Sequence, residues 1–266
     1  MKMRRLIVLS FFLFFAAIVS AQERGCFQVL TGYEGDFYSE PHNRDFNIYN
    51  VGFGYKGSLT AIYGKVNFGY LNMAGDKYRG KKQFELDYYQ SLTKTKSTTI
   101  WINYAYSQAT IFPEHRLTYE LWQKLPANLL ISGGGNHYFF PETNATILNL
   151  GLEYYFSRYW VGFKTYFNLK DPKLTTSYTL AGRVFFNDVN YLHVGVGIGS
   201  AQDEPFLLPS DLYRLDARTL KLGYVTNVFK ERMQLRTGFT YSYEEYLDNE
   251  WRNRYSFGVG LIFNIR

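Results

Sequence analysis

The stretch WRNRYSFGVGLIFNIR, from Trp251 to Arg266, decides the fold of this 266-residue chain. Large apolar side chains occupy every second position in it, and small or polar residues stand between them. The apolar set is Tyr255, Phe257, Val259, Leu261 and Phe263, and the intervening set is Arg254, Ser256, Gly258 and Gly260. Such alternation, repeated along most of an aromatic-rich chain, is typical of membrane barrel strands. We therefore predict an all-β fold, a transmembrane antiparallel up-and-down β-barrel.

Similar alternating segments, each bounded by turn residues, fill the rest of the chain. We expect about 14 strands, with about 12 as the alternative, because sequence boundaries are uncertain by about two to four residues. Most segments are at least as long as the roughly 9 to 11 residues of a tilted membrane strand. They run over residues 27–38, 46–56, 59–73, 78–91, 98–107, 116–124, 129–139, 143–156, 159–168, 175–186, 190–199, 219–228, 233–244 and 251–264.

The connections between these segments are alternately short and long. Tight links occur at residues 57–58, 126–128, 157–158, 187–189 and 230–232, and longer ones at 39–45, 108–115, 199–218 and 246–250. The links 93–97 and 141–143 follow the rule less well. Bacterial barrels join their strands by short periplasmic turns and longer outer loops. The charged 199–218 loop is expected either to plug or cover the barrel mouth, or to be an ordinary solvated loop.

The N-terminus resembles an export signal. Lys2, Arg4 and Arg5 precede an apolar run that ends near Ala21. That run is shorter than the roughly 20 residues of a membrane-spanning helix, so a retained anchor is the weaker alternative. We predict a cleaved signal peptide at residues 1–21 and a single barrel domain at residues 22–266, located as a multi-pass barrel in a Gram-negative outer membrane.

Composition supports a membrane barrel and excludes other classes. Aromatic residues make up 20% of the chain, as expected for the aromatic girdles of a barrel. Three of the 29 basic residues lie in the predicted signal, so the net charge of +6 is no argument for a nucleic-acid partner. Cys26 is the only cysteine and is interpreted as an incidental thiol, with a lipid-modified cysteine as the minor alternative.

Charged residues recur on the strand faces opposite the apolar side chains, where the lumen should lie. They are Lys65, Glu85, Asp87, Glu120, Glu153, Lys164, Arg183, Lys221, Arg236 and Arg254. One interpretation is an electrostatic constriction that orients a polar solute. We favour the other, cross-strand ion pairs that satisfy buried charges. Lys221, Arg236 and Arg254 have no carboxylate between them in this arrangement, so an anionic solute or lipid phosphate is expected there.

Catalytic and metal-binding patterns are weak. The chain has four histidines, His42, His115, His137 and His193, and Ser107, Ser132 and Ser256 are candidate partners. Nothing in the sequence orders these residues into a triad, and no group has metal-ligand spacing. We predict no catalytic residue, metal or cofactor, and keep a lipid-modifying barrel enzyme as a minor alternative.

Several short motifs resemble the YaiO family of outer-membrane β-barrels. They are Phe84-Glu85-Leu86-Asp87, Tyr104-Ala105-Tyr106-Ser107, Ile111-Phe112-Pro113-Glu114-His115-Arg116, Tyr119-Glu120, Leu125-Pro126 and Arg252-Asn253-Arg254-Tyr255-Ser256. The resemblance runs from about Gly32 to the C-terminus. It implies outer-membrane localisation and an association with exopolysaccharide systems, and it carries no catalytic residues.

The corner formed by Glu114, His115 and Arg116 is the candidate loop contact, because it brings an acid, an imidazole and a guanidinium to the start of a strand. A structural role, in which Glu114 pairs with Arg116 or with a neighbouring strand, is the favoured alternative.

The predicted function is passage or handling of a polar, glycan-like solute. The alternative is a closed-lumen scaffold or interaction barrel that acts through its outer loops. Expected partners are outer-membrane lipid and lipopolysaccharide, the barrel insertion machinery and polysaccharide, with no nucleic acid.

Overall fold

A computed structural model of the chain describes residues 25–39, 44–73, 75–108, 111–169, 174–199, 216–229, 232–247 and 249–265. The predicted signal peptide, residues 1–21, lies outside this part of the chain, as do residues 200–215 of the predicted plug loop. Within the described residues, no helix has the length and apolar character of a membrane span.

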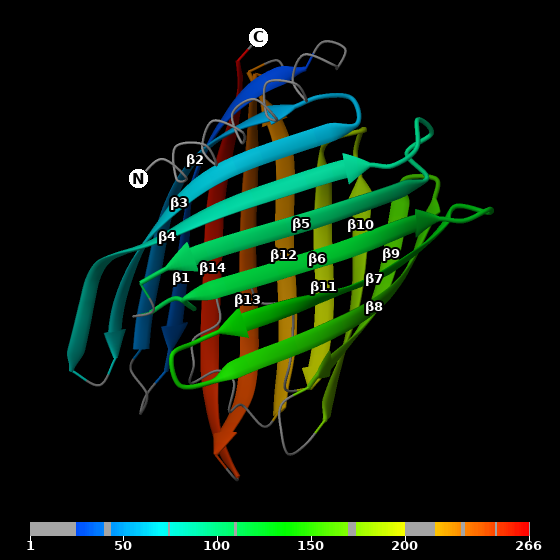
Figure 1. The fold of residues 1–266 in the computed structure, drawn as a ribbon. Coiled ribbons are helices and arrows are strands. Elements are labelled where there is room, and N and C mark those ends of the chain that lie inside the picture. Colours follow the sequence, from blue (N-terminus) through cyan, green and yellow to red (C-terminus); the bar gives the residue numbers. More distant parts are fainter. Residues whose placement is uncertain are drawn as a thin grey trace, which may run out of the picture.

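The described residues form one closed antiparallel barrel of 14 strands, in which each strand pairs with its neighbours in sequence (Figure 1). The strands are β1 (Cys26–Tyr38), β2 (Arg44–Lys56), β3 (Thr60–Met73), β4 (Asp76–Ser91), β5 (Thr98–Ser107), β6 (His115–Lys124), β7 (Leu129–Phe139), β8 (Asn144–Phe156), β9 (Tyr159–Asn168), β10 (Thr175–Phe185), β11 (Tyr191–Gly199), β12 (Asp216–Val228), β13 (Met233–Leu247) and β14 (Glu250–Ile265). The predicted fold class is confirmed, and the 12-strand alternative is excluded.

Closure of the barrel depends on the pairing of β1 with β14. Their register runs without interruption from Phe27 opposite Ile265 to Tyr38 opposite Arg254. The first and last strands therefore complete the same hydrogen-bonded ladder as every other pair, and no strand edge is left exposed to lipid. Because the strand number is even, β1 begins and β14 ends at the same end of the barrel.

The two ends of the barrel differ, and we name them by their connections. The turn end holds the start of β1, the end of β14 and the links that precede the odd-numbered strands from β3 to β13. Asn128 and Ser157 adopt positive φ values of 60° and 52° in two of these turns. The loop end holds the other connections, and β3 and β4 extend there as a long hairpin (Figure 1).

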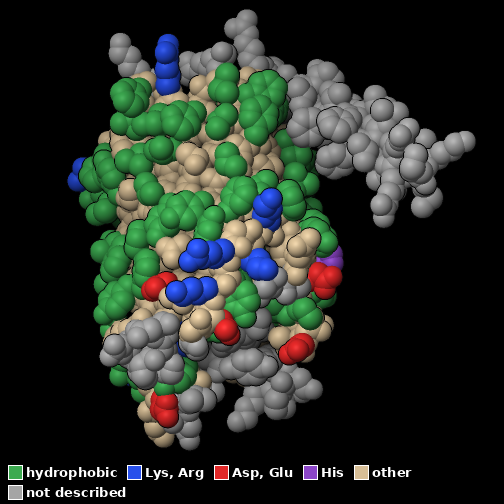
Figure 2. Space-filling model, turned by 90° about the vertical axis from the view of Figure 1, so that its left-hand side faces the viewer, with side chains coloured by type: hydrophobic (Ala, Val, Ile, Leu, Met, Phe, Trp, Pro, Cys, Tyr) green, Lys and Arg blue, Asp and Glu red, His purple; other side chains and the backbone are tan. Residues whose placement is uncertain are grey.

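Alternation sends apolar side chains outward and polar side chains inward. Phe53, Phe84, Leu150, Phe163 and Leu180 are among the exposed apolar side chains of the outer surface. Figure 2 shows one side of this surface, a broad hydrophobic region with basic side chains gathered below it, toward the loop end. The inner face instead buries many amides, hydroxyls and charged groups. The lumen is therefore the candidate location of a functional site.

Candidate functional site

Glu85 is the centre of an ion-paired wall formed by β3 to β6. Its carboxylate lies 3.0 Å from Lys65 Nζ and 3.1 Å from Arg116 Nη2. It also accepts hydrogen bonds from the side-chain amides of Asn67, at 2.9 Å, and Asn103, at 2.8 Å. Lys65 stands directly opposite Glu85 in the register of β3 and β4. Cross-strand ion pairs thus satisfy the buried charges of this wall.

A second ion pair reaches across two intervening strands. Lys164 Nζ of β9 lies 2.7 Å from Glu120 Oε1 of β6, although β7 and β8 separate these strands. Gly134 and Gly151 stand on the inner face of β7 and β8 between them. A Cβ at Gly134 would lie 2.9 Å from the Cα of Glu120, and one at Gly151 would lie 3.3 Å from Cγ of Lys164. Glycine at these positions therefore makes room for the long-range pair.

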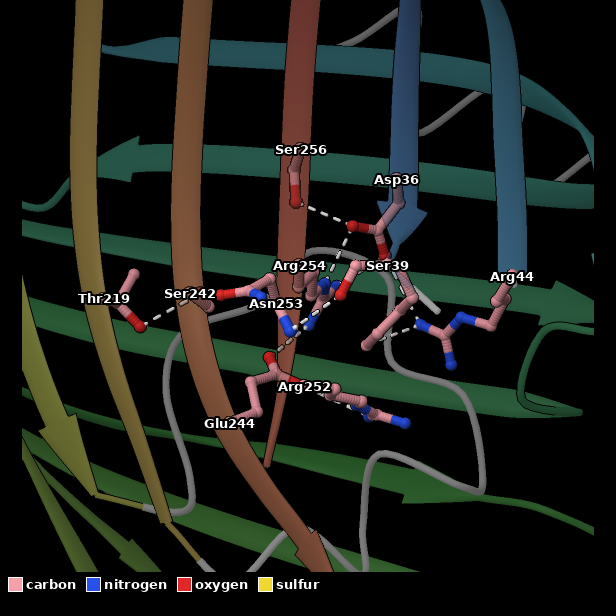
Figure 3. A network of polar contacts seen from close by, with 11 residues as sticks. Asp36, Ser39, Arg44, Thr219, Ser242, Glu244, Arg252, Asn253, Arg254 and Ser256 are labelled. Atoms are coloured by element: carbon pink, nitrogen blue, oxygen red, sulfur yellow. Dashed lines mark hydrogen bonds and ion pairs between the residues drawn. The ribbon is translucent and has the colours of Figure 1, made fainter. Parts of the chain in front are cut away.

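A third network joins the first and last strands of the barrel, β1 and β14, near the loop end (Figure 3). Arg254 of β14 donates to Asp36 of β1 at 2.7 and 2.8 Å, and Ser256 donates to the same carboxylate at 2.7 Å. Arg252 and Arg254 also lie 3.1 and 3.4 Å from Glu244 of β13. Arg254 therefore pairs with carboxylates on both neighbouring strands, Asp36 and Glu244, neither of which was among the predicted lumen charges.

Tyr38 is surrounded by arginines in this network. The guanidinium carbons of Arg44 and Arg252 each lie 4.0 Å from the centre of its ring, and that of Arg254 lies 5.5 Å away. Arg44 also donates to the Tyr38 hydroxyl at 2.8 Å. A ring face attracts cations through its quadrupole, so Tyr38 helps to hold three like charges close together.

The connection between β5 and β6 folds into the lumen. Ile111 and Phe112 are 2% and 3% exposed and pack against Phe46 and Ile48 of β2 and Leu71 of β3, which all lie on the inner face. This loop, rather than the described part of the 199–218 segment, narrows the loop end of the barrel.

A hydrogen bond and a small residue hold that loop in place. Ser107, at the end of β5, donates to the carbonyl oxygen of Pro113 at 2.8 Å. Gly69 leaves the space that the loop fills, since a Cβ there would lie 2.5 Å from Cδ1 of Ile111 and 2.7 Å from Cζ of Phe112.

Aromatic rings form a continuous ladder on the inner face near the turn end. Tyr63, Tyr89, Trp101 and Trp122 belong to the consecutive strands β3 to β6. Their successive ring centres are 6.3, 5.8 and 6.4 Å apart, and the last two pairs are stacked. Trp101 Nε1 donates to Asp87 at 3.0 Å, which fixes the indole inside the barrel. We call these four residues the aromatic ladder.

Three of the four tryptophans of the chain point inward. From the sequence, aromatic residues were expected to form girdles on the outer surface. Trp160 of β9 shares the inner face with the ladder tryptophans and donates through Nε1 to Glu153 at 2.8 Å. Trp251 alone lies on the outer face, stacked on Tyr243 with ring centres 4.6 Å apart. Alternation within residues 98–107 places Trp101 on the same face as polar residues. This pattern could have predicted that Trp101 faces the lumen.

Two cavities lie in the lumen. The first, of about 470 Å³, is lined by Glu34, Lys65, Arg236 and Arg254 together with glycines of β1, β13 and β14. The second, of about 580 Å³, is lined by Trp122 and Trp160 and by Glu153, Lys164, Arg183 and His193. Lys221 lines both cavities. The barrel interior therefore combines aromatic faces, charges and open space.

The structure separates the residues of the predicted loop contact. Arg116 points into the lumen and pairs with Glu85, whereas Glu114 is exposed in the loop. On the outer surface, His115 Nδ1 lies 2.7 Å from the Tyr104 hydroxyl, and its ring centre lies 5.4 Å from that of Tyr106 in a tilted contact. The three side chains do not converge on one site.

The other candidate lumen residues lie on the inner face. Asp87 pairs with Lys65 at 3.0 Å, and Arg236 donates to Gln234 at 2.8 Å. In the described part of the barrel, the sequence interpretation missed these five inward-facing charges: Glu34, Asp36, Arg44, Glu244 and Arg252. Alternation within 27–38, 233–244 and 251–264 could have found four of them, whereas Arg44 lies before the predicted start of its strand.

Ser107, Ser256, His115 and His137 have structural contacts, whereas Ser132 Oγ and His193 Nδ1 are buried without a hydrogen-bond partner among the described residues. Ser256 donates to Asp36, and His137 Nδ1 lies 3.0 Å from the Thr146 hydroxyl on the outer surface. His42 lies outside the described residues. Across the described ranges, no group of three or more His, Cys, Asp or Glu side chains has the arrangement of a metal site.

A closed ladder of strands with an apolar outside and a charged, aromatic inside defines the class of the protein, an outer-membrane β-barrel. Comparison with known families gives the same result. The YaiO membrane beta barrel domain matches residues 27–204, most of the chain, and the chain belongs to this family. No curated protein matches the sequence.

Solved structures with a similar barrel are outer-membrane proteins of low sequence identity. Omp33 of Acinetobacter baumannii has a TM-score of 0.49 and 10% identity, over 90% of this chain and 99% of that one. The translocator domain of the autotransporter NalP from Neisseria meningitidis has a TM-score of 0.49 and 10% identity, over 93% and 92%. An anion-selective porin from Comamonas acidovorans has a TM-score of 0.45 and 10% identity, over 91% and 99%.

Proposed function

We propose that the barrel passes or handles a polar, glycan-like solute, in association with an exopolysaccharide system. The observation that carries this proposal is the aromatic ladder of Tyr63, Tyr89, Trp101 and Trp122 inside the lumen. Tyrosine and tryptophan in a membrane barrel commonly serve at the lipid interfaces, so large rings that face water inside the barrel require a different reason.

A sugar is the class of solute that suits this wall. Sugar rings present apolar C–H faces edged by hydroxyls, and ligand sites commonly combine aromatic faces with a few placed polar groups. The ladder supplies rings on four adjacent strands, and Asp87 and Gln28 supply polar contacts beside Trp101 and Tyr63. Four neighbouring rings also match a chain of several sugar units better than a single unit.

Single-channel recording tests this proposal. We expect the purified protein in a planar bilayer to carry current, and added maltohexaose to reduce that current reversibly. Trp101→Ala removes the middle of the ladder and should weaken the block, whereas Trp251→Ala, on the outer face, should leave it unchanged. A current that maltohexaose does not reduce, or an equal effect in both variants, would contradict a sugar path along the ladder.

A closed-lumen scaffold is the second candidate, and the inward loop favours it. Ile111 and Phe112 narrow the loop end by packing on the inner face of β2 and β3. A folded protein that carries no current would support this candidate, with the outer loops as the contact surface for polysaccharide or a partner protein. A lipid-modifying enzyme is the third candidate, and loss of a lipid turnover on substitution of a serine or histidine would support it.

For partners, we propose that lipopolysaccharide phosphates bind the outer surface of β4 near the loop end. Lys77, Arg79 and Lys82 are exposed there, and Lys82 Nζ lies 6.0 Å from the ring centre of Phe68. Replacing the three by glutamine should lower the lipopolysaccharide that copurifies with the protein. The control variant replaces Lys94 and Lys96, which are exposed in a turn at the opposite end of the barrel. Equal amounts of copurified lipopolysaccharide in the two variants would refute the proposal.

We also propose that residues 1–21 are a signal peptide removed on export, and that the barrel insertion machinery assembles residues 22–266 in the outer membrane. The charged start and short apolar run support the first part. N-terminal sequencing of protein purified from outer membranes should begin at Gln22, and a retained Met1 would contradict it.

A further inference from the structure

Glu34 of β1 is a lumen carboxylate that the barrel wall leaves without a partner. It stands opposite Ile48 on one neighbouring strand and Gly258 on the other, and neither can pair with a charge. Among the described residues, no hydrogen bond or ion pair involves its carboxylate, whereas Asp36, two residues further along the same face, is held by Arg254. Polar groups inside a protein normally have partners, so Glu34 points to a ligand that supplies hydrogen-bond donors.

Asn50 and Arg236 bring further hydrogen-bonding groups to the same place. The side-chain amide of Asn50 has no hydrogen-bond partner in the described part of the chain. Arg236 donates through Nε to Gln234 at 2.8 Å, and its two terminal nitrogens are unpartnered within the described ranges. Glu34, Asn50 and Arg236 all line the cavity of about 470 Å³. An ionised carboxylate only accepts, a guanidinium only donates and an amide does both, so the three side chains complement one another.

Two glycines form the surface between these side chains. Gly260 of β14 is opposite Arg236 of β13 on one side and opposite Gly32 of β1 on the other. Gly32 is in turn opposite Asn50 of β2, and a Cβ at Gly32 would lie 2.9 Å from Nδ2 of Asn50. A Cβ at Gly260 would have no contact closer than 3.8 Å. The cavity therefore has a floor of bare backbone, Gly32 and Gly260, with hydrogen-bonding side chains at its edges.

The free charges at this site are one acid and one base. The other charged side chains of the described lining each have an interaction within the protein, and they are Asp36, Lys65, Lys221 and Arg254. A neutral solute is favoured, since an acidic one would meet Glu34 and a basic one would meet Arg236. A sugar hydroxyl can donate to the carboxylate and accept from the guanidinium, so it suits both groups.

We infer that this cavity binds a neutral sugar unit, with its hydroxyl groups held by Glu34, Asn50 and Arg236 and its ring against the glycine floor. The inference rests on the proposed function, because it adds a second contact for the same solute. The aromatic ladder lies on β3 to β6, whereas β1, β2, β13 and β14 supply most of this cavity. A neutral unit differs from the anionic solute expected from the sequence, where Glu34 was not among the lumen charges.

Isothermal titration calorimetry of the refolded full chain tests the inference, at pH 8.5 and in a detergent without a sugar headgroup. The titrants are the neutral maltohexaose and the acidic hexagalacturonate. We expect Glu34→Ala to weaken maltohexaose binding by about tenfold, the effect of losing about 1.4 kcal/mol. Glu34→Gln should keep part of this binding, because an amide oxygen still accepts. The unchanged protein should bind maltohexaose more tightly than hexagalacturonate, and Glu34→Gln should narrow that difference by removing the repelling charge.

A second variant tests the glycine floor independently of charge. Gly260→Leu places a side chain on the floor and should also weaken maltohexaose binding by about tenfold. Gly64→Leu is the matched control, because Gly64 is exposed on the outer surface of β3 and a Cβ there would meet no atom within 4 Å. It should bind maltohexaose as the unchanged protein does.

Unchanged maltohexaose binding in either Glu34→Ala or Gly260→Leu would overturn the inference, as would tighter binding of hexagalacturonate than of maltohexaose to the unchanged protein. The proposed function would stand in that case if Trp101→Ala still weakened maltohexaose binding. Failure of maltohexaose to bind the unchanged protein would instead refute the proposed function. Heat-modifiable migration on a gel confirms that each variant is folded.

Discussion

At the scale of single residues, Glu85 holds most of the polar contacts of one lumen wall. Lys65, Arg116, Asn67 and Asn103 all donate to it. Removing one partner of a buried ion pair lowers the stability of the fold by more than the intact pair contributes to it. The reason is that the remaining charge stays buried and keeps its desolvation penalty. We expect Glu85→Gln to lower the free energy of unfolding by about 2 kcal/mol.

Urea unfolding in lipid vesicles, followed by tryptophan fluorescence, measures this loss. Glu142→Gln is the control, because Glu142 is exposed in a connection at the loop end. An equal and small effect of both substitutions would show that Glu85 is not the centre of a stabilising network.

The assignment of faces is testable with two neighbouring residues of β14. Val259 is 42% exposed on the outer surface, whereas Gly260 faces the lumen beside Arg236. Val259→Arg should lower the free energy of unfolding in lipid vesicles by about 2 to 4 kcal/mol, because the charge would face lipid near the midplane of the bilayer. Gly260→Gln should cost much less, since its Cβ has no contact closer than 3.8 Å. The opposite order of stabilities would mean that the faces are reversed.

The sequence predicts which face a residue occupies better than it predicts the residue's partner. Alternation places Glu85, Glu120 and Lys164 correctly inside the barrel. It cannot show that Lys164 passes over two strands to reach Glu120, because that contact depends on barrel curvature and on small residues between the strands. The partners of Arg254, in contrast, lie on the two adjacent strands, where alternation could have found them.

At the scale of elements, the loop between β5 and β6 narrows the lumen through an apolar contact. Replacing both Ile111 and Phe112 by serine removes the side chains that bury against β2 and β3. We expect the loop to leave the wall and the single-channel current to rise. Glu142→Ser, in a different connection, should not change the current. No rise in the double variant would indicate that the loop is held mainly by backbone and Ser107 contacts.

Strand positions were predictable because turn residues and alternation agree at most boundaries. The observed β5, β7 and β9 begin and end at the predicted residues, and the other ends differ by three residues or fewer. The larger differences, in β12 and β13, occur where pairing continues past the apolar alternation, as in Glu245 opposite Trp251. The inward loop was not predictable, since Ile111 and Phe112 reveal their role only through strands far away in sequence.

At the scale of the whole molecule, the closed ladder should resist detergent. We expect the refolded protein to migrate faster on a gel when unheated than after boiling, because the β1 to β14 pairing keeps the barrel compact. Identical migration before and after boiling would contradict a stable closed barrel. Arg254→Ala, which removes the ion pair across that seam, should lower the temperature at which the slower form appears.

Glycines on the inner face of β12, β13, β14 and β1 give the lumen one smooth side. Gly223 stands opposite Gly238, Gly238 opposite Gly258, and Gly260 opposite Gly32. On the opposite side, the wall centred on Glu85 fills its space with paired side chains. One open region of the lumen therefore lies to one side, against these glycines. A polymer that passed through the barrel, as we propose, would meet this backbone surface with one edge and the paired side chains with the other.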